Sequence, residues 1–239
     1  MIIAHRGASA EAPENTLSSF KAAFELGVDY IELDVQLSAD QIPIVVHDDS
    51  TDRVTQNAVR QKIAELTCEQ LQSLDVGKWF SPKFKGEPMP TLAQVLALAR
   101  GTSGVMIEIK ESPLSIPQMA YAVLKVIEQE KQIAGPVVIA SFNPKILEYI
   151  QKKTPEKELL GLIETEEDLK QFEKLHLTRL GVNNDILTIS LAKRINKKYS
   201  IWCWTVDSLE RATTLIEWGI QGIITNNPRM LKNYFTKNM

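Results

Sequence analysis

The 239 residues match the usual size of one α/β barrel, roughly 250 residues, and 44% hydrophobic with 24% charged residues is an ordinary globular composition. The net charge is −3 and no clustered basic face is written into the sequence, which excludes nucleic-acid binding. The length leads us to expect a single domain over residues 1–239. No apolar stretch reaches the ~18 residues that a membrane-spanning helix needs, so we expect no membrane span.

Short apolar segments alternate with amphipathic stretches along the chain. Val and Ile often occupy consecutive positions in these segments, which is typical of strands buried on both faces of a parallel sheet. The expected strands are Ile2–His5, Tyr30–Leu37, Ile44–His47, Val105–Lys110, Val137–Phe142, Leu159–Ile163, Leu180–Asn183, Ile201–Val206 and Gly222–Thr225. The expected helices are Thr16–Leu26, Leu92–Arg100, Ile116–Lys131, Pro144–Lys153, Thr188–Lys198 and Ser208–Trp218.

The second and third expected strands are too close together for a parallel connection. Only residues 38–43 separate them, and a parallel crossover needs room for a helix. We therefore expect residues 30–37 and 43–47 to form an antiparallel hairpin, which places His47 near Glu32 and Asp34. The other strands then make an eight-stranded parallel set, which predicts a (β/α)8 TIM-type barrel.

Residues 48–90 lack the alternation of strands and helices seen elsewhere. This segment contains Arg53, one short helix and an aromatic run with Trp79, Phe80 and Phe84. Barrel enzymes carry their functional loops at the C-terminal face. We therefore expect residues 48–90 to be a small insertion over that face, after the second strand.

Capping patterns mark several helix ends. Thr67, Thr91 and Asp207 each stand three residues before Gln or Glu, which predicts an N-terminal cap at each of them. Gly27 and Gly219 follow expected helices and are expected to terminate them.

Two of the histidines stand at the ends of expected strands, where barrel enzymes place catalytic groups. His5 ends the first strand and precedes Arg6 and Gly7. His47 ends the hairpin, while His176 lies in a surface-like stretch and has no expected role. A lone histidine is more often structural than catalytic, so position makes His5 and His47 the candidates.

Glu32 and Asp34 share one face of their strand because side chains alternate with a period of two. A solvent-facing surface is the simple explanation, but both faces of a barrel strand are covered. Two buried carboxylates repel each other unless a cation or a proton lies between them. Glu108 repeats the pattern on the next parallel strand, so the three carboxylates predict a site for a hard divalent cation.

Lys110 and Trp204 also stand near strand ends. Lys110 follows Glu108 with the same spacing, so it either supplies a positive charge beside the metal or forms a structural salt bridge with Glu108. Trp204 closes a late strand, where it either forms the floor of a substrate pocket or packs in the core.

Two imidazoles, three carboxylates, an Arg and a Lys indicate phosphodiester cleavage. A carboxylate-bound cation and two basic side chains stabilise negative charge on phosphoryl oxygens, and a pair of histidines supplies a general base and a general acid. An aldolase or a decarboxylase would need a Schiff-base Lys or a different acid, so those activities come second.

These residues resemble the glycerophosphodiester phosphodiesterase family, in its bacterial cytoplasmic form. The resemblance covers essentially the whole chain, in order. The matching segments are His5-Arg6-Gly7, Pro13-Glu14-Asn15-Thr16, Glu32-Leu33-Asp34-Val35, His47-Asp48 with Arg53, Pro90-Thr91-Leu92, Glu108-Ile109-Lys110, Ser141-Phe142, Trp204-Thr205 and Gly222-Ile223-Ile224-Thr225.

The resemblance implies an eight-stranded barrel that hydrolyses a small-molecule glycerophosphodiester to sn-glycerol 3-phosphate and an alcohol such as choline or ethanolamine. The implied roles are Mg²⁺ or Ca²⁺ binding by Glu32, Asp34 and Glu108, acid–base catalysis by His5 and His47, and phosphate binding by Arg6 and Lys110. Trp204 is the further candidate for substrate contact.

Three places in the chain depart from the pattern of that family. The run after His47-Asp48 departs at Ser50, Thr51 and Val54, Asn226 stands where Asp is usual, and Asp207 stands where Asn is common. We expect none of them to touch the metal or histidine positions, so they bear on substrate preference rather than on chemistry.

The substrate itself suggests a mechanism. Its glycerol carries a hydroxyl next to the ester carbon, and attack by this oriented group would form a transient cyclic phosphate. Which of His5 and His47 starts as the base is left open. Alternative functions are a lysophospholipase-D-like or sphingomyelinase-D-like lipid phosphodiesterase, or a catalytically silent phosphate-binding barrel.

Cys68 and Cys203 are far apart and form no C-x-x-C pair. Two isolated thiols fit a reducing compartment, and the N-terminus does not resemble a signal peptide. We therefore expect a cytoplasmic protein, and the sequence indicates no oligomeric state.

Overall fold

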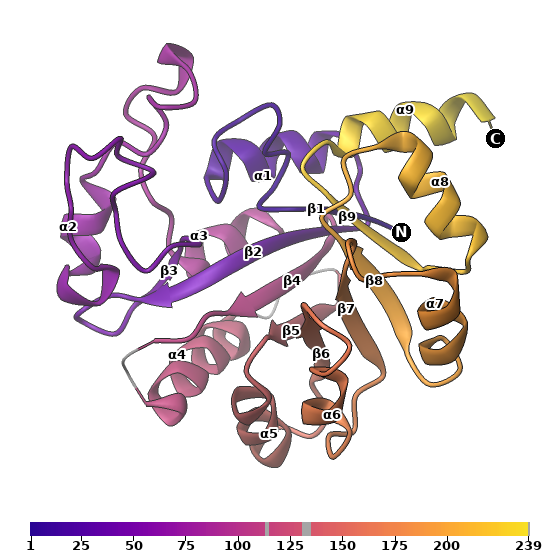
Figure 1. Ribbon diagram of the computed structural model, residues 1–239. Coiled ribbons are helices and arrows are strands. Elements are labelled where there is room, and N and C mark those ends of the chain that lie inside the picture. Colours follow the sequence, from indigo (N-terminus) through magenta and orange to yellow (C-terminus); the bar gives the residue numbers. More distant parts are fainter. Residues whose placement is uncertain (113–114, 131–134, 239) are drawn as a thin grey trace.

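Eight parallel strands close into a barrel within residues 1–112, 115–130 and 135–238, the part of the chain that this computed structural model describes (Figure 1). The ring runs β1-β9-β8-β7-β6-β5-β4-β2, and pairing of β1 with β2 completes it. The strands are β1 (Ile2–Ala4), β2 (Tyr30–Leu37), β4 (Gly104–Ile109), β5 (Val137–Ser141), β6 (Glu158–Ile163), β7 (Arg179–Asn183), β8 (Ser200–Trp204) and β9 (Gly222–Thr225). The expected (β/α)8 barrel is confirmed.

The expected hairpin is also present. Strand β3 (Pro43–Val45) pairs antiparallel with β2, and Val35 lies opposite Val45. The hairpin extends β2 beyond the barrel and brings His47 back toward the end of the strands. This strand is therefore an arm, as its short connection to β2 predicts.

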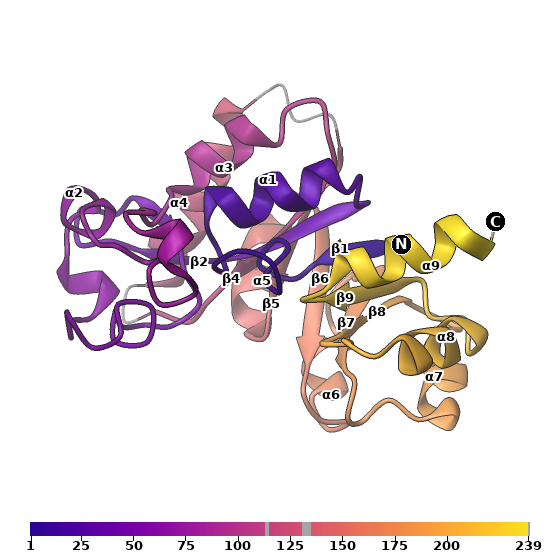
Figure 2. The ribbon, with the colours of Figure 1, turned by 90° about the horizontal axis from the view of Figure 1, so that it is seen from above.

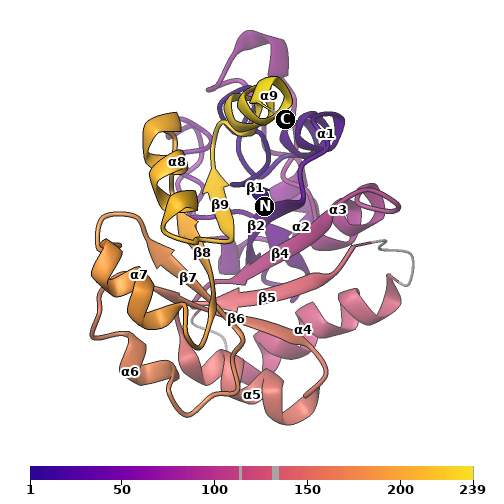
Figure 3. The same ribbon diagram turned by 90° about the vertical axis from the view of Figure 1, so that its right-hand side faces the viewer.

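Helices surround the barrel, as the end-on view in Figure 3 shows. They are α1 (Leu17–Glu25), α3 (Leu92–Leu98), α4 (Ile116–Gln129), α5 (Pro144–Lys153), α6 (Leu169–Phe172), α7 (Ile189–Ile195), α8 (Leu209–Glu217) and α9 (Pro228–Asn238). Helix α2 (Cys68–Gln72) lies apart from them, within residues 48–90. None of the helices in the described ranges combines the length and the apolar character needed to cross a bilayer.

The sequence patterns found the amphipathic helices but missed α6 and α9. Helix α6 has one turn, too short for a periodic pattern, and α9 is a polar helix that contributes the buried Leu231 to the core. The helix expected over Ile116–Lys131 is confirmed up to Gln129, and Lys131 lies outside the described residues.

Most of the expected caps are present, but one is wrong. Thr67 and Thr91 form capping boxes, and Gly27 and Gly219 follow helices with φ of +65° and +82°. The cap of α8 is not Asp207 but Ser208, whose hydroxyl accepts a hydrogen bond from a backbone amide in the first turn. The carboxylate of Asp207 is used elsewhere, because donors at the end of β9 reach it instead.

The interior of the barrel has its own small core at the N-terminal half of the strands. Alternate residues along each strand point inward. The inward cluster is Ile3, Tyr30, Met106, Val138, Ala140, Leu160, Leu162, Trp202 and Ile224. Outward residues such as Ile31 and Ile107 pack against the helices in a second, larger core. Side chains therefore fill the interior of the barrel at the N-terminal half of the strands, and a ligand can bind only at the C-terminal end.

Residues 48–90 form a segment with a separate core. Its buried cluster joins the hairpin arm to the segment through Ile44, Val46, Val54, Ile63, Leu66, Leu71, Val76 and Met89. Figures 1 and 2 show this violet-to-magenta segment beside the end of the barrel toward which β2 points. The aromatic side chains of Trp79, Phe80 and Phe84 contact one another edge to face.

The turn after β1 is unusually tight. Arg6 and Gly7 both have positive φ, +55° and +83°, and the hydroxyl of Ser19 donates to the Arg6 carbonyl oxygen at 2.9 Å. A Cβ on Gly7 would lie 2.7 Å from the carbonyl carbon of Ser19. Close contact between this turn and helix α1 therefore requires glycine, and it fixes the position from which the His5 and Arg6 side chains start.

Gly7→Ala should lower the free energy of unfolding by roughly 2–5 kcal/mol, measured by urea denaturation. The left-handed backbone costs about 1–2 kcal/mol, and the contact with Ser19 adds about 1–3 kcal/mol of overpacking. Gly86→Ala is the matched control, because Gly86 has φ +85° with no atom within 4 Å of its Cβ position. Equal losses for the two variants would show that the contact with Ser19 is unimportant.

Candidate active site

The site lies just beyond the inward apolar core, at the C-terminal ends of the barrel strands. On each of these strands the residue two positions after an inward core side chain lines the pocket: Ile3 leads to His5, Tyr30 to Glu32, Met106 to Glu108, Ala140 to Phe142, Leu162 to Glu164 and Trp202 to Trp204. These side chains line a pocket of about 230 Å³ together with Arg6, His47, Lys110 and Thr205. Because the eight barrel strands are parallel, their C-terminal ends meet at this one place.

Three buried carboxylates form the floor of the site. Oxygen atoms of Glu32, Asp34 and Glu108 lie within 4.8 Å of one another, and β2 and β4 pair with Asp34 opposite Glu108. Burial and the charges of Asp34 and Glu108 raise the pKa of Glu32 well above its ordinary value. Burial and the charge of Asp34 raise the pKa of Glu108 to about 7. The predicted clustering of these residues is confirmed.

Two basic side chains partly neutralise this cluster. The ammonium group of Lys110 forms ion pairs with Glu108 and, at 2.9 Å, with Asp34. The guanidinium of Arg6 lies 3.2 Å from Asp34, and the Arg6 backbone amide donates to Glu32 at 2.8 Å. Burial alone would raise the pKa of Asp34, but Lys110 and Arg6 hold it below its ordinary value. Both expected basic side chains, Arg6 and Lys110, are therefore at the site.

The carboxylates fit a hard divalent cation. Three carboxyl groups face two basic side chains, and burial together with the charges of Asp34 and Glu108 raises the pKa of Glu32 although Arg6 lowers it. The cluster offers oxygen atoms only, and carboxylate oxygen is the ligand type that Mg²⁺ and Ca²⁺ prefer. Charge and donor chemistry thus agree with the sequence prediction.

His5 is held at the edge of the carboxylate cluster. Its Nε2 lies 4.0 Å from Glu32, and its Nδ1 lies 2.7 Å from the side-chain oxygen of Asn226. Burial and the nearby Arg6 lower the pKa of His5 to about 4. The imidazole is therefore neutral near pH 7, with Nδ1 engaged by a partner.

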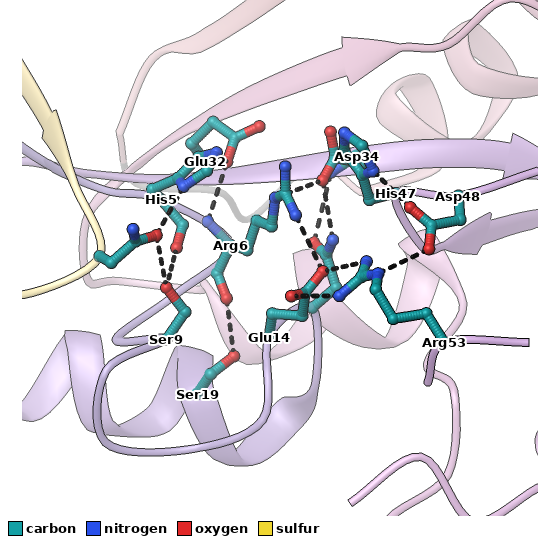
Figure 4. Close-up of polar contacts among 12 residues, drawn as sticks. His5, Arg6, Ser9, Glu14, Ser19, Glu32, Asp34, His47, Asp48 and Arg53 are labelled. Carbon is teal, nitrogen blue, oxygen red and sulfur yellow. Dashed lines mark hydrogen bonds and ion pairs between the residues drawn. The ribbon is translucent and has the colours of Figure 1, made fainter. Parts of the chain in front are cut away.

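His47 is held by a different kind of partner. Its Nδ1 lies 2.7 Å from a carboxylate oxygen of Asp48. Arg53 donates to the other Asp48 oxygen at 2.7 Å and also binds Glu14 through two hydrogen bonds of 2.8 Å (Figure 4). Glu14 in turn accepts a hydrogen bond from Arg6 at 2.9 Å. This chain of charges joins the segment 48–90 to the turn after β1 and positions His47 at the pocket.

The departures at positions 207 and 226 were interpreted wrongly from the sequence. We expected neither to touch the metal or histidine positions, yet Asn226 binds His5 directly. The Asn226 amide nitrogen donates to Asp207 at 2.6 Å. The two positions are far from His5 in the sequence, and only closure of the barrel between β1 and β9 brings them to it.

Several other residues of the site had no role assigned from the sequence. Asn15, with φ +55°, donates from its side chain to Asp34 at 2.8 Å, and Glu14 bridges Arg6 and Arg53. The motif Pro13-Glu14-Asn15-Thr16 carried a signal for both, since a polar pair between a strand and a helix stands at a site-forming loop.

The far wall of the pocket is aromatic. Trp204 lines the pocket and contacts Phe142 edge to face, with ring centroids 5.4 Å apart. Of the two expectations for Trp204, a place in the pocket lining is therefore correct, although its ring also packs against the inner core. Glu164, which the sequence did not single out, lines the same pocket.

Comparison with known proteins connects this geometry to one family. The family model described as "Glycerophosphoryl diester phosphodiesterase family" matches residues 5–230. The glycerophosphodiester phosphodiesterase of Caldanaerobacter subterraneus subsp. tengcongensis is 35% identical over 243 residues, covering 99% of this chain and 98% of that protein. That of Bacillus altitudinis is 30% identical, covering 95% of this chain and 94% of that protein.

The fold likeness to solved structures is equally extensive. The structure of an Oleispira antarctica phosphodiesterase in complex with the product sn-glycerol-3-phosphate has a TM-score of 0.92 and 25% sequence identity. The match covers 99% of this chain and 96% of that one. Since the family model and the relatives both span nearly the whole sequence, the chain belongs to the glycerophosphoryl diester phosphodiesterase family.

Proposed function

We propose that the protein hydrolyses glycerophosphodiesters to sn-glycerol 3-phosphate and an alcohol. The observation that carries this proposal is the pocket itself, in which two histidines with engaged Nδ1 atoms stand beside three carboxylates and two basic side chains. Family membership supports it, as does the product bound to the Oleispira antarctica phosphodiesterase.

Glu32, Asp34 and Glu108 would hold the divalent cation, Mg²⁺ or Ca²⁺. When bound, the ion adds positive charge that stabilises the negative charge of the phosphoryl oxygens. Arg6 and Lys110 orient the phosphate from the same side, because both end beside Asp34. Trp204 contacts the substrate from the aromatic wall.

His5 and His47 exchange protons with the substrate through their Nε2 atoms, since the Nδ1 atoms are engaged by Asn226 and Asp48. One histidine takes the proton of the glycerol 2-hydroxyl, whose oxygen attacks phosphorus. The other gives a proton to the alcohol oxygen as its bond to phosphorus breaks. Water then opens the cyclic phosphate with the roles reversed.

The surface of the segment 48–90 gives little support to the lipid-directed alternatives. These would be favoured by an exposed apolar rim, but Trp79, Phe80 and Phe84 pack against one another and are only partly exposed. A catalytically silent phosphate-binding barrel needs positive charge to bind phosphate but has no use for a pair of histidines, so the presence of both His5 and His47 at the pocket argues against it. The segment 48–90 would instead serve as one wall of the site over the C-terminal face, with Arg53 as its link to His47.

A cytoplasmic location is consistent with the cysteines. Both Cys68 and Cys203 are free, and Cys203 is buried. A chain without a disulfide suits a reducing compartment.

Removal of divalent metal should abolish activity, and Mg²⁺ or Ca²⁺ should restore it. The same ions should raise the melting temperature of the protein, because a ligand that binds only the native state stabilises it, by about 2.7 kcal/mol at 100 times Kd. Glu32→Gln should lose both responses without destabilising the metal-free protein, since it removes a buried carboxylate whose pKa is raised. Full turnover in excess EDTA after dialysis would refute the metal assignment.

Lys110→Ala should weaken competitive inhibition by sn-glycerol 3-phosphate by about 10- to 100-fold, the loss expected for one charged hydrogen bond. Inhibition constants from steady-state kinetics provide the measurement. Lys62→Ala is the control, because Lys62 forms an exposed ion pair with Asp49 away from the pocket. If turnover and inhibition both stayed unchanged in Lys110→Ala, Lys110 would be only a structural partner of Glu108.

A substrate that lacks the glycerol 2-hydroxyl should bind but not turn over. Attack by a hydroxyl already held in place, rather than by a water molecule from solvent, lowers the activation free energy by roughly 7–11 kcal/mol. The deoxy compound is first tested as a competitive inhibitor, which establishes that it occupies the site, and its hydrolysis is then followed by release of the alcohol. A near-normal rate would mean that water attacks phosphorus directly and that no cyclic phosphate forms.

A further inference from the structure

The end of β9 carries a short hydrogen-bond relay that reaches His5. Asn226 accepts from His5 Nδ1 at 2.7 Å and donates its amide to Asp207 at 2.6 Å. Asp207 is itself fixed by donors, because the Thr225 hydroxyl and the Asn226 backbone amide both reach its other oxygen at 2.8 Å. The Ser9 hydroxyl lies 2.9 Å from the same Asn226 oxygen.

The carboxylate at the far end of this relay decides which way the Asn226 amide points. A carboxylate only accepts hydrogen bonds, so the amide group that faces Asp207 must be the NH₂. The reverse orientation would place two acceptor oxygens 2.6 Å apart. The amide oxygen is therefore turned toward His5, and an oxygen at that place requires the proton to be on Nδ1.

We propose that Asp207 and Asn226 are positioning residues that hold His5 in its Nδ1-protonated tautomer and so keep Nε2 free to exchange a proton with the substrate. This inference rests on the proposed function of His5. Neither Asp207 nor Asn226 lines the pocket among the described residues, so both act through the imidazole. The hydrogen-bond pattern predicts what each substitution does to it.

Asp207→Asn should reverse the relay. The new amide would offer its oxygen to the Thr225 hydroxyl and the Asn226 backbone amide, leaving its NH₂ to face the side chain of Asn226. Asn226 would then turn its own oxygen toward position 207 and its NH₂ toward His5. That arrangement favours the opposite tautomer, with the proton on Nε2, where it blocks the exchange.

Asn226→Asp alone should also fail, because two carboxylates would face each other at 2.6 Å. The double exchange Asp207→Asn/Asn226→Asp repairs both defects. The carboxylate at position 226 accepts from His5 Nδ1 and from the amide at position 207. Loss in each single variant with recovery in the pair is a result that a merely structural role would not produce.

The tautomer is measured directly by ¹⁵N NMR of imidazole nitrogens in the metal-free protein. The chain has three histidines, and each signal is assigned by replacing its histidine with Gln. We expect a hydrogen-bonded Nδ1–H signal for His5 in the unmodified protein and in the double variant, and a shift toward the Nε2–H pattern in Asp207→Asn.

Kinetics with a glycerophosphodiester provide the second readout. Each single variant should lower kcat by about 10-fold or more, well inside the loss of up to ~10⁴-fold that a wrong histidine tautomer causes. KM should stay within about threefold, and the double variant should recover to within about threefold of the original kcat. Asp75→Asn is the control: its carboxylate also accepts two backbone amides, at 3.0 Å, but it lies in the segment 48–90 away from His5.

An unchanged His5 spectrum and kcat in Asp207→Asn would overturn the inference. So would a double variant no better than the single ones. If Asp207→Asn does not fold, the same decision falls to Asn226→Asp against the double variant. Absence of any glycerophosphodiester turnover in the unmodified protein would refute the proposed function instead, and the NMR comparison would still decide how His5 is held.

Discussion

The burial of three carboxylates inside one barrel is the constraint to which the other parts of the site respond. Glu32, Asp34 and Glu108 meet within 4.8 Å because parallel strands bring their last inward positions to one place. Such a cluster is unfavourable without compensating charge. Arg6 and Lys110 supply part of it, and the remaining negative charge is what makes the cluster suited to a divalent cation.

Both histidines are anchored through Nδ1, but by chemically different partners. His47 faces the carboxylate of Asp48, whereas His5 faces the neutral amide of Asn226, with a carboxylate one step further away at Asp207. A carboxylate stabilises a positive imidazole more than an amide does. The two imidazoles therefore present the same nitrogen to the pocket but have different partners behind them.

The barrel and the segment 48–90 contribute different parts of the site. The strands supply carboxylates and the aromatic wall from rigid, paired positions. The segment has its own apolar cluster and is joined to the pocket by charge, through Arg53, Glu14 and Arg6. These contacts hold His47 at the pocket through Asp48 and Arg53.

Local pattern was sufficient to predict the barrel, the hairpin and the inward face of Glu32, Asp34 and Glu108. Each depends on spacing along one strand or on the length of one connection, and such features are legible in a single sequence. The same reasoning found His5 and His47, since each follows closely on the end of a strand. Helices α6 and α9 were missed because one is a single turn and the other a largely polar helix.

The orientation of His5 also required the tertiary structure. Asp207 and Asn226 reach His5 from the far end of the chain, and only pairing of β1 with β9 makes them neighbours. Sequence alone thus determined the three carboxylates, the two histidines and the two basic side chains of the site, whereas closure of the barrel decided the partner of His5, because that partner lies across strand ends that are distant in the chain.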